Sequence, residues 1–167
     1  MSRFQRLLAN LFDGWFQLRR RFPARVLDEI ADAIAAGERT HKGEVRVAFE
    51  SRLGPWAVLQ GLDAPTRARQ VFTHLRVWDT EHNCGVLFYV LMAEHRIEIV
   101  ADRGIARRVA PAEWAAICTG VRDHFARGEW REGALRGIAD VHALLRQHFP
   151  GDGVERLDEL PDRPVML

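Results

Sequence analysis

The spacing of hydrophobic and polar positions changes along the chain, and these changes predict where strands lie. Residues 85–93 contain no charged side chain, which is typical of a strand buried on both faces. Residues 97–101 form a second apolar run after a short polar turn. Residues 44–50 alternate between apolar and polar side chains, which predicts a strand with one covered face and one wetter face.

Helical spacing of apolar side chains predicts five helices around these strands. Proline is favoured in the first turn of a helix, and Pro23, Pro65 and Pro111 stand at or near the expected starts of three of them. The expected helices cover residues 2–21, a segment opened by Pro23, residues 64–78, a segment opened by Pro111, and residues 130–148.

The order of these elements predicts a three-layer α/β/α sandwich with a small mixed β-sheet. The segments 44–50, 64–78 and 85–93 form a β-α-β unit, so the two strands should run parallel, joined by a right-handed crossover. The segment 97–101 should return antiparallel as a hairpin. We expect the most apolar strand, 85–93, in the centre of the sheet, with helices on both faces.

The chain divides into three regions by composition. Residues 1–22 form a basic amphipathic helix, and residues 23–150 form the folded domain. Residues 151–167 are net acidic and contain glycine and proline, which predicts a non-helical tail. The last four residues, 164–167, either dock in a groove or hang free.

Composition narrows the function classes. The chain has 167 residues, of which 47% are hydrophobic and 28% charged, as expected for one globular domain. The net charge is +1, and no strand interleaves basic and aromatic residues, so we expect no nucleic-acid partner. Cys84 and Cys118 fit no metal or disulfide spacing, which favours free thiols in a reducing compartment. No apolar run approaches the ~20 residues of a membrane-spanning helix, and we expect a cytoplasmic protein.

Polar side chains should converge at one end of the predicted hairpin. Asp79, Glu81 and Asn83 precede its first strand, and Asp102 follows its second. Hard cations such as Ca²⁺ or Mg²⁺ bind oxygen ligands of this kind, which makes the four residues candidate metal ligands. The alternative is a polar turn whose side chains cap local backbone groups.

The same end of the sheet supplies candidates for catalysis. A weak metal-assisted phosphatase could use a cation held by the acidic residues, Arg103 to neutralise phosphoryl charge and His82 as the acid or base. The sequence contains no glycine-rich phosphate loop and no nucleophile elbow. We therefore expect no organic cofactor, and we favour a non-catalytic binding module over the enzyme.

The N-terminal segment is the second candidate functional region, as a surface that contacts a membrane or a protein partner. Residues 1–26 contain six arginines against Asp13 alone. Residues 2–21 could lie on an anionic membrane surface at the inner face of the membrane, or contact a protein partner. They could instead pack on the domain or on a second copy. The candidate contact residues are Phe4, Leu8, Phe12, Trp15, Arg19, Arg20 and Arg21.

Three segments of the sequence resemble the TPM domain family. Residues 83–91 and 95–104 are similar to the family's asparagine-rich approach, paired strands and closing glycine. Residues 125–133 are similar to its segment between the last two helices. The resemblance covers roughly residues 23–150. Two departures stand out, because Cys84 replaces the second asparagine of the usual pair and Asp102-Arg103-Gly104 replaces the usual Gly-x-Gly.

This resemblance implies an α/β/α sandwich and a divalent-cation site in its loops. By position, Asp79, Asn83 and Asp102 match the acidic or amide loop positions of the family best. It also implies acid phosphatase activity, known in chloroplast members, or an accessory role in membrane complexes. Many members are exported or membrane-tethered, whereas this chain is similar to a short cytoplasmic subgroup without signal peptide or anchor.

Overall fold

The computed structural model describes residues 3–12, 15–152 and 159–167. Its helices are α1 (Arg3–Phe12), α2 (Trp15–Arg21), α3 (Ala24–Glu38), α4 (Pro55–Leu59), α5 (Ala64–His74), α6 (Arg103–Ala106), α7 (Pro111–Ala126) and α8 (Trp130–His148). Its strands are β1 (Glu44–Glu50), β2 (Gly85–Leu91), β3 (Arg96–Ala101) and β4 (Val165–Met166).

The strands form one mixed sheet in the order β3-β2-β1-β4. β1 pairs in parallel with β2, from Glu44 opposite Gly85 to Glu50 opposite Leu91. β2 pairs antiparallel with β3, and Val86 lies opposite Ala101. The predicted β-α-β unit, the hairpin and the inner position of the most apolar strand are therefore confirmed.

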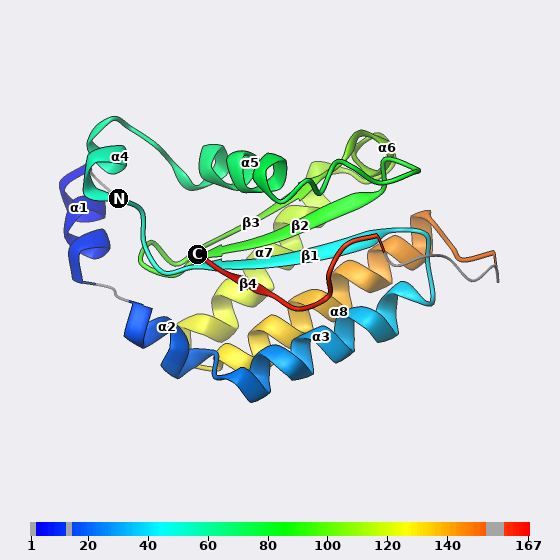
Figure 1. Cartoon of the computed structure of the whole chain (residues 1–167), viewed down its shortest axis with the longest axis horizontal. Coiled ribbons are helices and arrows are strands. Elements are labelled where there is room, and N and C mark those ends of the chain that lie inside the picture. Colours follow the sequence, from blue (N-terminus) through cyan, green and yellow to red (C-terminus); the bar gives the residue numbers. More distant parts are fainter. Residues whose placement is uncertain (1–2, 13–14, 153–158) are drawn as a thin grey trace.

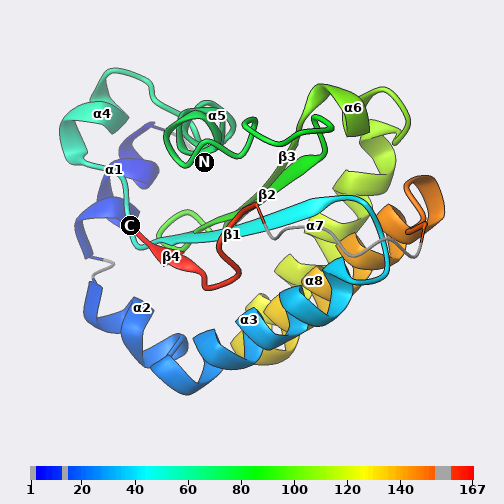
Figure 2. The same ribbon diagram turned by 45° about the vertical axis from the view of Figure 1, so that its right-hand side comes forward.

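The sheet is the middle of three layers, as predicted (Figures 1 and 2). α3, α7 and α8 cover one face, and α4 and α5 cover the other. Each face has its own apolar core, because β2 is buried on both sides. The first core includes Phe22, which stacks on Phe49 with ring centroids 4.1 Å apart. The second core joins Val58 and Val71 to Leu87 and Tyr89.

Three predicted element boundaries are wrong. Strand β2 ends at Leu91 rather than residue 93, because the chain turns into the hairpin there. Helix α5 ends at His74 rather than residue 78, and Arg76 just beyond it has a φ of +53° that no helix continues. The single helix expected over residues 2–21 is two helices, α1 and α2.

The expectation that β1 has one wetter face is also wrong. All seven of its residues are buried, including the charged ones. Arg46 donates hydrogen bonds to the carbonyl oxygens of Pro161 and Arg163 in the C-terminal segment. Glu50 accepts from Arg67 on α5 and from Tyr89 on β2. The alternation of apolar and polar residues therefore distinguishes the two faces of β1 correctly. The polar side chains are covered by other parts of the protein and not by water.

The C-terminal residues dock on the free edge of β1 as strand β4, which the sequence left open. Ala48 lies opposite Val165, and Leu167 N donates to Phe49 O at 2.8 Å. Leu160 is buried in the second core. The tail therefore contributes a strand and a core side chain to the domain.

None of the helices in the described ranges has both the length and the apolar character needed to cross a lipid bilayer.

Candidate functional site

The hairpin brings together the two segments in which cation ligands are predicted. Asp102 N donates to Gly85 O at 2.9 Å, and Gly104 N donates to Asn83 O at 3.1 Å. A Cβ atom on Gly104 would lie 2.5 Å from Asn83 O, so only glycine permits this approach. Asn83 itself has a φ of +51°, a left-handed conformation that asparagine adopts more readily than most residues.

Asp102 is the buried member of this group. Its Oδ1 accepts from Arg103 N at 2.6 Å and caps the short helix α6. Its Oδ2 is buried and has no hydrogen-bond partner among the described residues. A cavity of about 320 Å³ lies beside this cap, lined by His82, Asn83, Arg103, Gly104 and Arg107.

The other candidate ligands do not gather around Asp102. Asp79 and Glu81 are exposed, and Glu81 N donates to Glu159 Oε2 at 2.9 Å. Within residues 3–12, 15–152 and 159–167, no three His, Cys, Asp or Glu side chains form a group that could hold a metal ion. The cation site at Asp79, Glu81, Asn83 and Asp102 therefore stays a prediction.

The cysteine in this region is not an activated nucleophile. Cys84 is buried beside Thr80, and burial raises the pKa of its thiol above the usual range. Cys118 lies on α7, where burial raises the pKa of its thiol to about 11. Both thiols are free and remain protonated near neutral pH, which disfavours nucleophilic attack.

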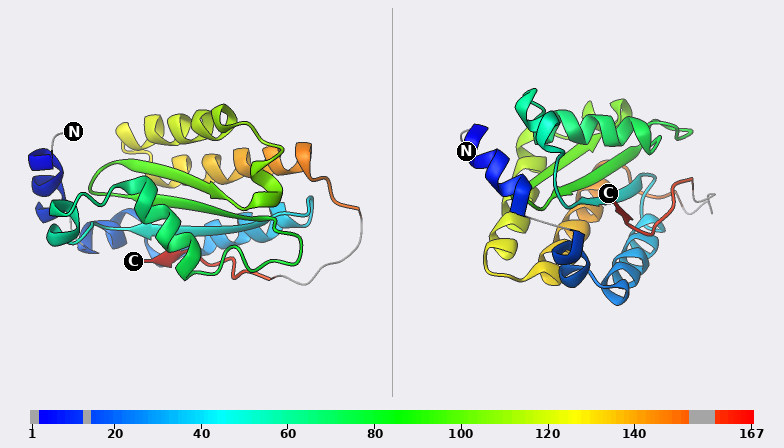
Figure 3. Two further views of the ribbon diagram at one scale, coloured as in Figure 1. Left: turned by 90° about the horizontal axis from the view of Figure 1, so that it is seen from above. Right: turned by 60° about the vertical axis from the view of Figure 1, so that its left-hand side comes forward.

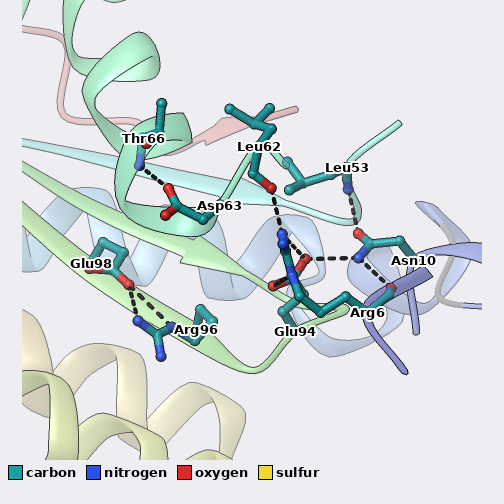
Figure 4. Close-up of polar contacts among 9 residues, drawn as sticks. All are labelled: Arg6, Asn10, Leu53, Leu62, Asp63, Thr66, Glu94, Arg96 and Glu98. Atoms are coloured by element: carbon teal, nitrogen blue, oxygen red, sulfur yellow. Dashed lines mark hydrogen bonds and ion pairs between the residues drawn. The ribbon is translucent and has the colours of Figure 1, made fainter. Parts of the chain in front are cut away.

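The N-terminal helix docks on the opposite end of the molecule, beside the turn between β2 and β3 (Figures 1 and 3). Arg6 forms a bidentate ion pair with Glu94, with its Nε 2.8 Å from Oε2 and its Nη2 2.9 Å from Oε1. Asn10 donates to Glu94 Oε1 at 2.9 Å and accepts from Leu53 N at 2.6 Å (Figure 4). Arg6 also donates to Leu62 O. The inner face of α1 therefore carries these polar side chains beside Leu7, which is partly buried against the second core.

This inward polar face leaves much of the apolar face of α1 exposed. Phe4 is 68% exposed, Leu8 39% and Leu11 46%, at the i, i+4, i+7 spacing of one helical stripe. Helix α4 packs beside α1 and adds Trp56 and Leu59, which are 71% and 54% exposed. We call these five residues the apolar docking face.

The remaining candidate contact residues fall in several environments. Arg19 and Arg20 are exposed on α2, where Phe16 is also exposed. Arg21 is half-buried, with its guanidinium carbon 4.3 Å from the centre of the Trp130 ring. The side chains of Phe12 and Trp15 lie outside the described residues.

Sequence reasoning missed the residues that orient α1. Arg6 and Asn10 have the i, i+4 spacing of a polar stripe, which ordinarily faces solvent. Their partner Glu94 is 88 residues from Arg6 along the chain. Only the fold brings the three side chains together, so no local signal could have identified them.

A pair of buried histidines was missed as well. His41 Nε2 and His142 Nδ1 are 2.7 Å apart, and Gly43 N donates to His41 Nδ1. Burial, together with the charge of Arg146, lowers the pKa of His41 to about 4. Burial, together with His41 and Arg146, lowers the pKa of His142 to about 3. The two rings are neutral near pH 7, with His41 as the donor and His142 as the acceptor.

Known proteins resemble this chain in sequence and in fold. The model of the TPM domain family, which bears the name TPM phosphatase, matches residues 22–144. The NMR structure of the BA42 protein from the psychrophilic bacterium Bizionia argentinensis is similar, with a TM-score of 0.75 and 28% sequence identity. The similarity covers 87% of this chain and 94% of BA42. None of the curated proteins searched matches the sequence. The chain belongs to the TPM domain family.

Proposed function

We propose that this TPM domain is a non-catalytic binding module that attaches peripherally to an anionic membrane through its apolar docking face. The observation that carries this proposal is the orientation of α1. Arg6 and Asn10 hold its polar side against Glu94, so Phe4, Leu8 and Leu11 point away from the domain core.

This orientation of α1 leaves apolar side chains unburied, which costs the fold hydrophobic stabilisation. Full burial of one large apolar side chain contributes about 1.5–3 kcal/mol. An amphipathic helix that served only the fold would turn its apolar stripe inward. Five large apolar side chains on two neighbouring helices instead face solvent. Such a patch gains free energy when it inserts at the boundary between lipid headgroups and acyl chains.

Charge favours an anionic lipid surface over a neutral one. Arg19 and Arg20 are exposed on α2, and Arg52 is exposed beside the C-terminal end of α1, with its Nη1 3.4 Å from Leu11 O. Each basic side chain near an anionic leaflet contributes about 1 kcal/mol. Trp56 suits the same location, because tryptophan is enriched at membrane interfaces. The free cysteines favour the cytoplasmic leaflet.

Vesicle sedimentation tests this proposal with matched tryptophan variants. The full chain should sediment with phosphatidylcholine vesicles that contain phosphatidylglycerol, and much less with phosphatidylcholine alone. Trp56→Ala and Leu8→Asp should weaken binding. Trp78→Ala should not, since Trp78 is 48% exposed but lies outside the docking face. Equal sedimentation of Leu8→Asp and the unaltered protein would refute the proposal.

A metal-assisted phosphatase at the other end of the sheet is the second candidate. The observation that favours it is the buried Asp102 Oδ2 without a hydrogen-bond partner, beside a cavity that Arg103 and Arg107 line. In this reading the two guanidinium groups bind a phosphate monoester and His82 donates or accepts a proton.

Two measurements separate the second candidate from the first. Ca²⁺ or Mg²⁺ titration should shift backbone amide signals of residues 79–83 and 102–104 if a cation binds there. Hydrolysis of a generic phosphate monoester should fall in Asp102→Asn but not in Asp123→Asn, an exposed position on α7. Unchanged spectra together with no hydrolysis would eliminate the enzyme and leave the binding module.

A further inference from the structure

A larger cavity lies between α2 and the start of α8, apart from both sites described above. Its volume is about 680 Å³, which is within the usual range for small-molecule sites. Three arginines line it against a single acidic side chain, Glu132, and two aromatic rings form part of its wall. The lining residues used below are Phe16, Arg20, Arg21, Trp130 and Arg131.

Two of the three arginines are held in place by other side chains. The guanidinium of Arg21 stacks over the Trp130 ring at 4.3 Å and donates to Gln17 Oε1 at 3.1 Å. Trp130 in turn packs against Phe125, with ring centroids 4.9 Å apart. Arg131 is tied to Glu29 on α3 by a hydrogen bond from its Nε. These guanidinium groups are therefore pre-organised, which reduces the entropy lost when an anion binds.

We propose that this cavity binds a phosphate monoester. A planar guanidinium donates two parallel hydrogen bonds to phosphate oxygens. Arg131 is ion-paired with Glu29 and Glu132, so the guanidinium groups of Arg20 and Arg21 are the ones that match the charge of a phosphate dianion. The volume exceeds what a bare phosphate needs, and the rings of Trp130 and Phe16 offer apolar surface to an organic body. The ester could be a lipid headgroup or a soluble metabolite. The lipid source rests on the proposed membrane function, whereas the cavity itself does not.

A soluble probe tests the cavity in the absence of membranes. Glycerol 3-phosphate should shift the indole N–H signal of Trp130 saturably, and sulfate should do so more weakly because it lacks the ester's organic body. Arg21→Lys and Arg20→Lys keep the positive charge but remove the planar guanidinium that donates two hydrogen bonds. Each variant should lower the affinity for glycerol 3-phosphate about tenfold, because one charge-assisted hydrogen bond is lost. Arg20 is exposed, so its variant does not disturb the fold.

Arg122→Lys is the matched control, because Arg122 is exposed on α7 and lies outside the cavity. It should leave the affinity unchanged. A Trp130 signal that does not saturate, or an equal loss in Arg122→Lys, would overturn the proposal, since both indicate diffuse attraction to positive charge.

Vesicles then identify the source of the ester. Phosphatidic acid carries a phosphate monoester, whereas phosphatidylglycerol carries a diester, so the two are compared at equal surface charge. A preference for phosphatidic acid that Arg20→Lys removes assigns a lipid ligand. Equal binding to both, with a saturable glycerol 3-phosphate shift, assigns a soluble ester. Leu8→Asp should weaken vesicle binding and leave that shift intact, which separates failure of the membrane proposal from failure of the cavity.

Discussion

Arg6 Nε lies 2.8 Å from Glu94 Oε2, although the two residues are 88 positions apart in the sequence. Their side chains are only 14% and 7% exposed. The hydrogen bond to Glu94 raises the pKa of Arg6, so the guanidinium keeps its charge under all ordinary conditions. Together with the hydrogen bonds of Asn10, this ion pair fixes which side of α1 faces the domain, and so which side faces outward.

Loss of the Glu94 carboxylate should release α1 from the domain. Glu94→Gln leaves Arg6 with a neutral partner in a largely buried place, and loss of one member of such a pair costs about 3 kcal/mol. Because α1 contributes no strand to the sheet, it can detach without unfolding it. Hydrogen exchange should show loss of protection in residues 3–12 and little change in β2.

Glu98→Gln is the control for this variant. Glu98 pairs with Arg96 on the same hairpin, and the Arg96 side chain is 48% exposed, so the pair contributes little. Retained protection of α1 in Glu94→Gln would contradict the assigned role of the ion pair.

Acid should destabilise the domain through His41 and His142. Both rings are neutral in the folded protein because burial lowers their pKa values, while the unfolded chain binds protons near pH 6.5. Below pH 6.5 the unfolded state therefore holds more protons, and stability falls as pH falls toward about 4. The slope is up to about 1.4 kcal/mol per pH unit for each histidine.

Urea unfolding between pH 4.5 and 7.5 measures this slope. His142→Phe should flatten it, because one titrating ring is removed. His74→Gln should leave it unchanged, since His74 is exposed at the end of α5. An equal slope in His142→Phe and the unaltered protein would show that other groups cause the acid sensitivity.

Loss of the buried Glu50 carboxylate should destabilise the domain more than loss of the Tyr89 hydroxyl that donates to it. Arg67 Nε donates to Glu50 Oε2 at 2.8 Å, and Tyr89 Oη donates to the same oxygen at 2.6 Å. Glu50→Gln leaves a partly buried guanidinium without its countercharge, which should cost about 2–4 kcal/mol. Tyr89→Phe removes one hydrogen bond and should cost about 1–2 kcal/mol. Denaturant unfolding that gave the reverse order would contradict this reading.

Truncation of two leucines to alanine should change the stability of the domain by different amounts. Leu160→Ala should destabilise the domain by about 2–3 kcal/mol, because Leu160 is buried in the second core. Leu59→Ala should leave stability within about 0.5 kcal/mol, since Leu59 is 54% exposed. Thermal unfolding of the two variants checks both statements. Equal stability losses would mean that the C-terminal segment does not anchor on the sheet.

Periodicity predicted the elements whose environment is set by local sequence. The apolar run that begins at Gly85 is an inner strand. Because the next strand returns antiparallel, Asp102 lies opposite Gly85 and Gly104 lies opposite Asn83. The orientation of α1 depends on Glu94, and the burial of Arg46 depends on carbonyl groups 115 and 117 residues away. Such long-range polar partners leave no trace in local spacing.

The candidate sites also differ in whether the local sequence could predict them. His82, Asn83 and Arg103 line one cavity, which the predicted hairpin explains. The prediction groups Asp79 and Glu81 with Asp102 because they lie at the same end of the hairpin, but both are exposed whereas Asp102 is buried. The cavity beside Trp130 joins α2 to α8, and nothing in the sequence relates those two segments.

Membrane attachment through the apolar docking face is tested most directly by measuring which residues lie close to the lipid. Bicelles that contain anionic lipid and a nitroxide-labelled lipid broaden the amide signals of residues near the lipid. Attachment through the apolar docking face predicts the strongest broadening in α1 and α4, around Leu8 and Trp56, and none in α6 at the other end of the molecule (Figure 1). Uniform broadening, or broadening strongest around Arg103, would contradict it.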